Sequence, residues 1–238
     1  MKLLTVGQYK LDKSKDEGYL TAGFNLSPHK ESVPFGGINM CANAGTCSAH
    51  CLKTAGFNKM PTHMPARVER TITMASHWPV FDRMAEKELG AFMRKAGRDG
   101  LTPICRPNLL SDRPQLEKLV RKHQPDLLCY DYTKLAKPWL REHELYHLTY
   151  SLDTHNEREA IEAINHGINV AVVFNPKEPI PDSFKLGGVE YPTLDGDKHD
   201  LRFLDPHGHI VALKGKTVQG GVDAPIESGF YRTTEVAA

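Results

Sequence analysis

Apolar and polar positions follow two different periods along the chain. Between residues 66 and 95 the apolar positions recur about every 3.6 residues, which predicts helix, and Pro79 is expected to divide this stretch into two helices. Residues 169–175 are instead almost continuously apolar and rich in β-branched side chains. That composition is typical of a strand buried on both faces of a parallel sheet. The chain is therefore expected to combine helices with a parallel sheet.

The other expected elements alternate along the chain. Further strands are predicted within residues 1–11 and at 19–26, 100–107, 125–133 and 146–152, and further helices at 112–123 and 156–167. In the middle of the chain, strand, loop and helix repeat at intervals of roughly 25 residues, which is the wiring of parallel βα units. This pattern predicts an α/β fold in which residues 1–238 form one domain, a partial (β/α) barrel.

The C-terminal part of the chain departs from this pattern. Residues 201–204 and 209–214 flank a polar turn at 205–208, and together they predict a C-terminal β-hairpin. The Asp- and His-rich stretches at 197–200 and 205–209 look like metal-ligand clusters. Their composition is also that of solvated turns, which is the interpretation we favour.

Three of the five cysteines lie within eleven residues, as Cys41, Cys47 and Cys51, with the spacing C-x5-C-x3-C. Small residues fill the gaps, and a loop with Gly and Pro at 33–39 precedes the first cysteine, so the backbone can wrap around a metal centre. Three thiolates can hold three irons of a cubane cluster and leave the fourth iron open to a small ligand. We therefore expect a [4Fe–4S] cluster in an N-terminal cysteine loop.

Two alternatives to the iron–sulfur cluster stay open. A structural zinc site uses four nitrogen or sulfur ligands, usually as two short pairs. His50 adjoins Cys51, so both could bind one ion only with strained geometry, whereas His63 could reach the site by a loop. Three ordinary buried thiols are the other alternative, because free cysteine is often a small apolar residue of the core. Cys105 and Cys129 lie on or near predicted strands and are expected to pack in the core in this way.

Composition and charge argue against several classes of function. The net charge of +1, with histidines neutral, gives no electrostatic footprint of a dedicated nucleic-acid-binding protein. No stretch is apolar enough for a membrane span, and the N-terminus lacks the apolar run of a signal peptide. Clustered cysteines in an odd total favour a metal site in a reducing compartment over disulfides. We therefore expect a cytoplasmic protein that does not contact the membrane.

Polar residues at the ends of the predicted strands are the candidates for binding a cofactor or substrate, because chemistry in such folds sits at the C-terminal strand ends. Lys134 follows an apolar strand, where its ammonium group could receive a carboxylate or a phosphate. Ser151 and Asp153 could hydrogen-bond a ribose or an amino acid, and Asn175 ends the most apolar strand. A surface lysine and a helix-capping aspartate are the simpler alternatives for Lys134 and Asp153.

The sequence around the cysteines also resembles a known family. The run from Cys41 to Gly56 is similar to the phage gene-product-eighty-eight family, as are the segments 66–71, 130–134, 150–152 and 200–206. The likeness extends from about residue 20 to Phe230. It implies a bacteriophage origin, and hence the cytoplasm of an infected host cell, together with a radical-SAM-like partial barrel.

Analogy with radical S-adenosylmethionine enzymes implies a function. In these enzymes three cysteines bind a [4Fe–4S] cluster, its open iron takes S-adenosylmethionine, and reductive cleavage of that cofactor yields a radical that abstracts a substrate hydrogen. Their common spacing is C-x3-C-x2-C, and this chain has wider gaps in the same order, the longer one first. The resemblance implies an enzyme acting on a small metabolite, a nucleotide or a modified DNA base. The alternative is a non-catalytic phage protein whose structural zinc site binds a host partner.

Overall fold

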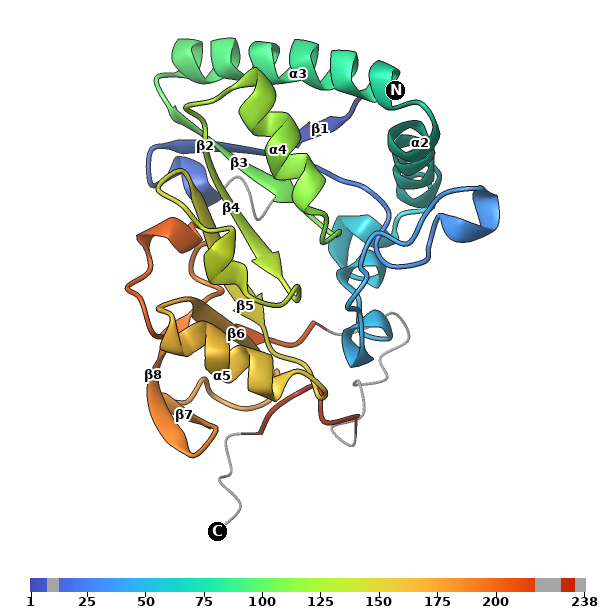
Figure 1. Ribbon diagram of the computed structural model, residues 1–238. Helices are drawn as coiled ribbons and strands as arrows, with labels where there is room; N and C mark the ends of the chain where they lie inside the picture. Colours follow the sequence, from blue (N-terminus) through green and yellow to red (C-terminus); the bar gives the residue numbers. More distant parts are fainter. Residues whose placement is uncertain (8–12, 217–227, 234–238) are drawn as a thin grey trace.

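The computed structural model describes residues 1–7, 13–216 and 228–233, and its strands form one mostly parallel sheet (Figure 1). The strands are β1 (Leu4–Val6), β2 (Tyr19–Phe24), β3 (Thr102–Asn108), β4 (Leu128–Thr133), β5 (Tyr146–Ser151), β6 (Asn169–Phe174), β7 (Ser183–Leu186), β8 (Val189–Asp195) and β9 (Ile210–Lys214). Their order across the sheet is β1-β2-β3-β4-β5-β6-β9-β8-β7. The neighbours in the run β2-β3-β4-β5-β6-β9-β8 are all parallel. At the two edges of the sheet, β1 pairs antiparallel with β2, and β7 pairs antiparallel with β8.

The α-helices are α2 (His63–Ser76), α3 (Trp78–Asp99), α4 (Pro114–His123) and α5 (Glu157–Asn165). The predicted division of the first helical stretch is confirmed: α2 ends before His77, and Pro79 lies in the first turn of α3, where a backbone N–H has no helical partner anyway. Gly100 ends α3 with a φ of 66°, a left-handed conformation that glycine adopts at little steric cost. Among the described residues, no helix is both long and apolar enough to cross a membrane.

Helices α3, α4 and α5 pack against one face of the sheet. Phe81 and Leu89 of α3 and Leu116 of α4 are fully buried in the larger apolar cluster. From the sheet this cluster includes Cys105 and Cys129, which are paired in register on β3 and β4 and are fully buried. These two cysteines therefore fill the core, as the sequence predicts, and belong to a different part of the molecule from the three clustered cysteines.

The opposite face of the sheet carries a smaller apolar cluster and a cavity. Ile104 of β3 and Tyr130 of β4 are buried on this face against Leu201. Side chains alternate along a strand, so Arg106 and Tyr132, two residues further along β3 and β4, point to the same side. Both of them line the cavity. The sheet thus separates a structural core on its helical face from polar groups on the other.

The predicted C-terminal β-hairpin is wrong. Arg202–Leu204 forms a 3₁₀ helix, and β9 inserts between β6 and β8, parallel to both. This position buries the side chains of Ile210 and Ala212 completely. An isolated hairpin would bury less apolar surface and would be less stable. A hairpin forms instead between β7 and β8, where Gly187 and Gly188 have the two positive φ values of a type I′ turn.

The mixed α/β class and the parallel βα wiring of the middle of the chain are confirmed by the parallel register of β3, β4, β5 and β6. The strand order describes an open sheet with β1 and β7 at its edges, and it does not show the predicted barrel. The alternation of strands and helices along the chain makes neighbouring strands parallel, because each helix returns the chain to the starting edge of the sheet. Closure depends on whether the two ends of the sheet meet, and no local sequence pattern encodes that.

Candidate functional site

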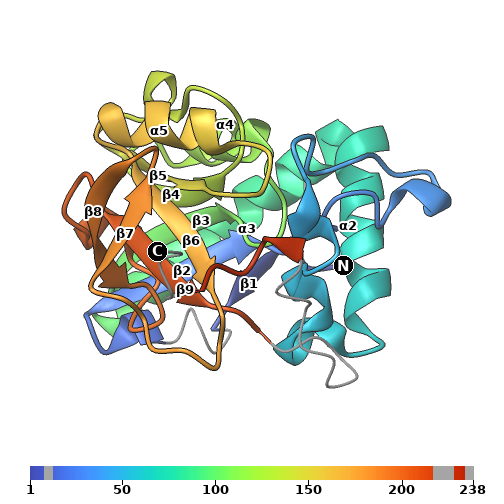
Figure 2. The same cartoon turned by 90° about the horizontal axis from the view of Figure 1, so that it is seen from below.

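A cavity of about 260 Å³ lies at the C-terminal ends of the central strands, on the side of the sheet away from the helices. It is lined by the cysteine segment (residues 28–59, between β2 and α2), by strand ends from β3 to β6 and β9, and by Phe230 and Tyr231. Figure 2 shows the C-terminal residues, in dark red, next to the light-blue cysteine segment. There His50 stacks on Phe230, with ring centroids 5.5 Å apart. Parts of the chain that are distant in sequence therefore build one site.

The cysteine segment brings all three clustered thiols to this cavity. Cys41, Cys47 and Cys51 line it, each is half-buried, and none forms a disulfide. Contacts with the loops at the strand ends hold the segment in place. Cys41 forms a backbone bridge with Asp112 after β3, and the N–H of Cys47 donates to Asp153 after β5 at 3.2 Å. The sheet thereby positions the cysteines that the sequence groups together.

Burial makes two of these thiols weak acids. It raises the pKa of Cys41 to about 12, although the N–H of His29 donates to its Sγ at 3.2 Å and opposes the shift. Negative charge on Asp112, Cys51 and Cys47 also raises the pKa of Cys41, so the thiols are close enough to repel one another as thiolates. Burial likewise raises the pKa of Cys51. Both thiols therefore stay protonated at neutral pH unless a metal displaces the proton.

The described residues contain no group of side chains arranged to hold a single metal ion. Within the described part of the chain, no three His, Cys, Asp or Glu side chains come together closely enough to hold one metal ion. A single zinc needs every ligand within about 2.3 Å of one centre, whereas a cubane cluster bonds each cysteine to a different iron. The described side chains therefore form no ready-made site for one ion.

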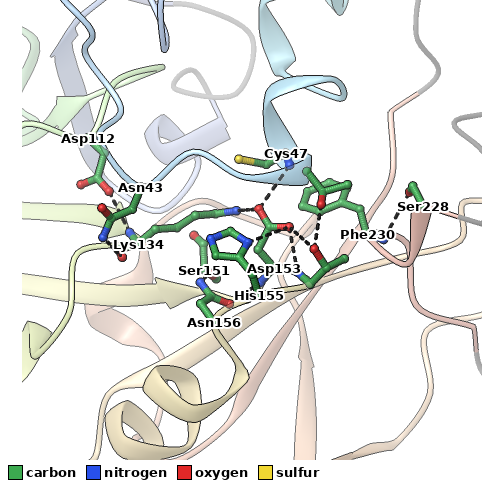
Figure 3. Close-up of polar contacts among 12 residues, drawn as sticks. Asn43, Cys47, Asp112, Lys134, Ser151, Asp153, His155, Asn156, Ser228 and Phe230 are labelled. Atoms are coloured by element: carbon green, nitrogen blue, oxygen red, sulfur yellow. Dashed lines mark hydrogen bonds and ion pairs between the residues drawn. The ribbon is translucent and has the colours of Figure 1, made fainter.

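Lys134 and Asp153 form an ion pair that joins the cavity to the cysteine segment (Figure 3). The side chain of Asp153 is fully buried, and besides Lys134 it accepts hydrogen bonds from the N–H groups of Cys47 and Thr154. Burial alone would raise the pKa of Asp153, but Lys134 and these donors hold it at about 2. The hydroxyls of Thr46 and Thr154, 2.7 Å apart, add a second link to the cysteine segment.

This ion pair predicts a pH-dependent stability. The pKa of Asp153 is about 2 in the folded protein and about 3.9 in an unfolded chain, so the stabilisation is complete above pH 4 and is lost as the pH falls through 2. Asp153→Asn is expected to lower the free energy of unfolding by about 2 kcal/mol at pH 7 and about half as much at pH 3. Chemical denaturation at both pH values measures this, with Asp182→Asn as the exposed control. An equal loss at pH 7 and pH 3 would show that the charge of Asp153 is not involved.

The four residues predicted to bind a cofactor or substrate do not all meet at the cavity. Lys134 and Ser151 line it, and Asp153 is ion-paired with Lys134. Asn175 is not part of the lining, and its side-chain amide donates to Glu178 at 2.7 Å in the turn after β6. The hydroxyl of Ser151 has no hydrogen-bond partner among the described residues. Of the four, Ser151 is therefore the one whose polar group is available to a ligand.

An ion pair on the cavity side of the sheet was not apparent from sequence patterns. Arg106 Nη1 donates to Asp200 at 2.6 Å, and the hydroxyl of Tyr132 donates to the same carboxylate at 3.3 Å. Asp200 belongs to a stretch predicted to be a solvated turn, but the residue is buried, so that prediction is wrong for Asp200. Its partner lies 94 residues away, and a local pattern cannot reveal such a pairing.

The fold and the lining of the cavity define an α/β protein with a cysteine-lined site at the C-terminal edge of a mostly parallel sheet. The chain belongs to the phage family described as Gene product 88, whose family model matches residues 2–233. No curated protein and no solved structure shows a significant match to the chain. The family resemblance of the cysteine run is thus confirmed.

Proposed function

We propose that the protein is an iron–sulfur enzyme in which Cys41, Cys47 and Cys51 hold a [4Fe–4S] cluster with one open iron for S-adenosylmethionine. The observation that carries the proposal is that three thiols from one loop line a single cavity at the C-terminal strand ends. A cluster of this kind supplies an electron at low potential for cleaving S-adenosylmethionine. The protein's own part is to hold the cysteines, enclose the site and orient a substrate such as a small metabolite or a nucleotide.

The route of the chain around the cavity supports this proposal. The cysteine segment follows β2, the first strand of the parallel part of the sheet, and α2 and α3 lead from it to β3. The ends of the following strands then face the cysteine segment across the cavity. In a radical-SAM-like partial barrel, the finer fold that we propose here, these strand ends hold the rest of the cofactor.

The inner wall of the cavity is suited to reactive chemistry. Ala171 and Val173 of β6 and Leu213 of β9 present apolar groups to it, and Phe230 adds an aromatic ring. The ammonium group of Lys134 lies 5.5 Å from the centre of that ring. Apolar walls exclude water, and this protects reactive intermediates from side reactions.

EPR spectroscopy of the reduced, anaerobically purified protein tests whether one iron of the cluster is open to S-adenosylmethionine. The proposal predicts a cluster signal that shifts when S-adenosylmethionine is added, because the cofactor binds the iron that has no cysteine. A cluster signal that ignores S-adenosylmethionine would identify a redox module and contradict this part of the proposal. A colourless protein with one zinc would favour the structural, partner-binding alternative.

Ser151 is expected to contact the bound cofactor directly. Its unpartnered hydroxyl lines the cavity, so Ser151→Ala should weaken binding of S-adenosylmethionine by about three- to tenfold, the usual effect of one hydrogen bond, and leave the iron content unchanged. Titration of the EPR shift measures the affinity. Ser76→Ala, at an exposed position near the end of α2, is the matched control. An unchanged affinity in Ser151→Ala would remove this residue from the cofactor site.

A further inference from the structure

The cavity contains a second polar centre, deeper in the sheet than the cysteines. Arg106 is two residues before the end of β3, about 7 Å below the strand end at the usual rise per residue. Its guanidinium carbon lies 4.7 Å from the ring centre of Tyr132, and its Nη1 donates to Asp200. The side chain of Arg106 is 13% exposed and lines the cavity. A charged group is therefore held rigidly at the inner end of the site.

One edge of this guanidinium has no partner. Arginine carries five N–H donors, and in Arg106 only Nη1 makes a hydrogen bond among the described residues. Its Nε is buried without a partner. Elsewhere in the protein, Nε and Nη2 of Arg67 each donate to the carboxylate of Glu31 at 2.9 Å. The Nε–Nη2 edge, which binds a carboxylate in Arg67, therefore has no partner in Arg106. Because a buried donor without a partner is unfavourable, a ligand that fills this edge would be stabilising.

The other charged groups around the cavity are paired with one another or point away from it. Three pairs neutralise each other: Arg106 with Asp200, Lys134 with Asp153 and Lys216 with Asp197. Lys214, at the end of β9, is also part of the lining, but it comes two residues after the core residue Ala212 and is paired in register with Phe174, so its side chain points to the helical face. Asp112 lines the cavity as well, but both its carboxylate oxygens already accept hydrogen bonds from the end of β4. The unfilled donors of Arg106 are therefore what this lining offers to an anion.

We propose that the Nε–Nη2 edge of Arg106 binds an anionic group of the substrate, a carboxylate or a phosphate. A planar arginine edge matches both groups with two parallel hydrogen bonds, and the ring of Tyr132 keeps that edge oriented. The role of the anion as part of a substrate rests on the proposed function. Binding of the anion itself needs no cluster, because Arg106 does not belong to the cysteine segment.

Isothermal titration calorimetry with inorganic phosphate and with succinate tests this site and distinguishes the two kinds of anion. Arg106→Lys keeps a positive charge opposite Asp200 and removes the planar edge, so the affinity for the preferred anion is expected to fall about tenfold. Tyr132→Leu should lower it about threefold, because the ring that keeps the edge of Arg106 oriented is lost. Lys185→Gln, at an exposed position of β7, is the matched control and should bind like the wild type.

The proposal is overturned if the wild type binds neither anion, or if folded Arg106→Lys binds as tightly as the wild type. Should Arg106→Lys fail to fold, Tyr132→Leu decides, and unchanged affinity in that variant overturns the site. Iron content measured on the same samples separates the two proposals. A protein without iron that still binds an anion through Arg106 would end the proposed function and leave this inference standing.

Discussion

Replacing any one of Cys41, Cys47 or Cys51 with alanine is expected to abolish the iron content of the protein. Each thiol lines the same cavity, and the other two cysteines, Cys105 and Cys129, are buried in the core on the opposite face of the sheet. A cubane cluster held by two cysteines loses one of its three protein bonds and is exposed to solvent and oxygen. Iron and sulfide analysis of anaerobically purified variants, together with the visible absorption spectrum, measures the loss.

Cys105→Ala is the matched control for these variants. Cys105 is fully buried on the helical face of the sheet, opposite the cavity, and is not part of its lining, so its removal changes core packing and leaves iron binding intact. Equal iron in the wild type and in all three cavity variants would show that the cysteines are not ligands. Equal loss in Cys105→Ala would show that iron retention follows stability instead of ligation.

The second large effect is expected at the ion pair that anchors the cysteine segment to α2. Arg67 donates to Glu31 through two hydrogen bonds of 2.9 Å, and a third goes to the backbone of Asn58 at 3.0 Å. The two charged side chains are only 2% and 6% exposed. Arg67→Met leaves the Glu31 carboxylate buried without its partner, which costs about 3–5 kcal/mol. Urea denaturation measures this loss, and faster release of iron should accompany it, because Glu31 and Asn58 lie on either side of the three cysteines.

A double variant separates the ion pair from the packing of the arginine stem. Arg67→Met combined with Glu31→Gln removes both charges and should regain part of the stability lost in the single variant. Arg98→Met, at an exposed position near the end of α3, is the control and should change stability by less than about 0.5 kcal/mol. A loss below about 1 kcal/mol in Arg67→Met would mean that this pair does not hold the cysteine segment.

The regular elements of the central part of the chain were predictable because their signals are local. The apolar run at 169–175 became β6, and the periodic stretch from residue 66 became α2 and α3, with the break beside Pro79. The position of β9 was not predictable in this way. Its partners β6 and β8 are chosen by burial of Ile210 and Ala212 within the whole sheet, whereas the adjacent turn favours a local hairpin.

The candidate site shows the same division between local and distant information. The spacing of the three cysteines was visible in the sequence because one short loop carries them all. The sequence also indicated Lys134 and Asp153, but not that they pair with each other across two strand ends. Arg106 and Asp200 are 94 residues apart, and their contact follows from the path of the chain between β8 and β9. Groups that meet only in the folded sheet leave no signal in a single sequence.

Iron, sulfide and zinc analysis of the anaerobically purified wild-type protein tests the central claim most directly. The account predicts about four irons and about four sulfides per chain, with little zinc, because three cavity-lining thiols serve three corners of a cubane. One zinc per chain with no iron or sulfide would contradict the account and leave the cysteine segment with a structural or partner-binding role.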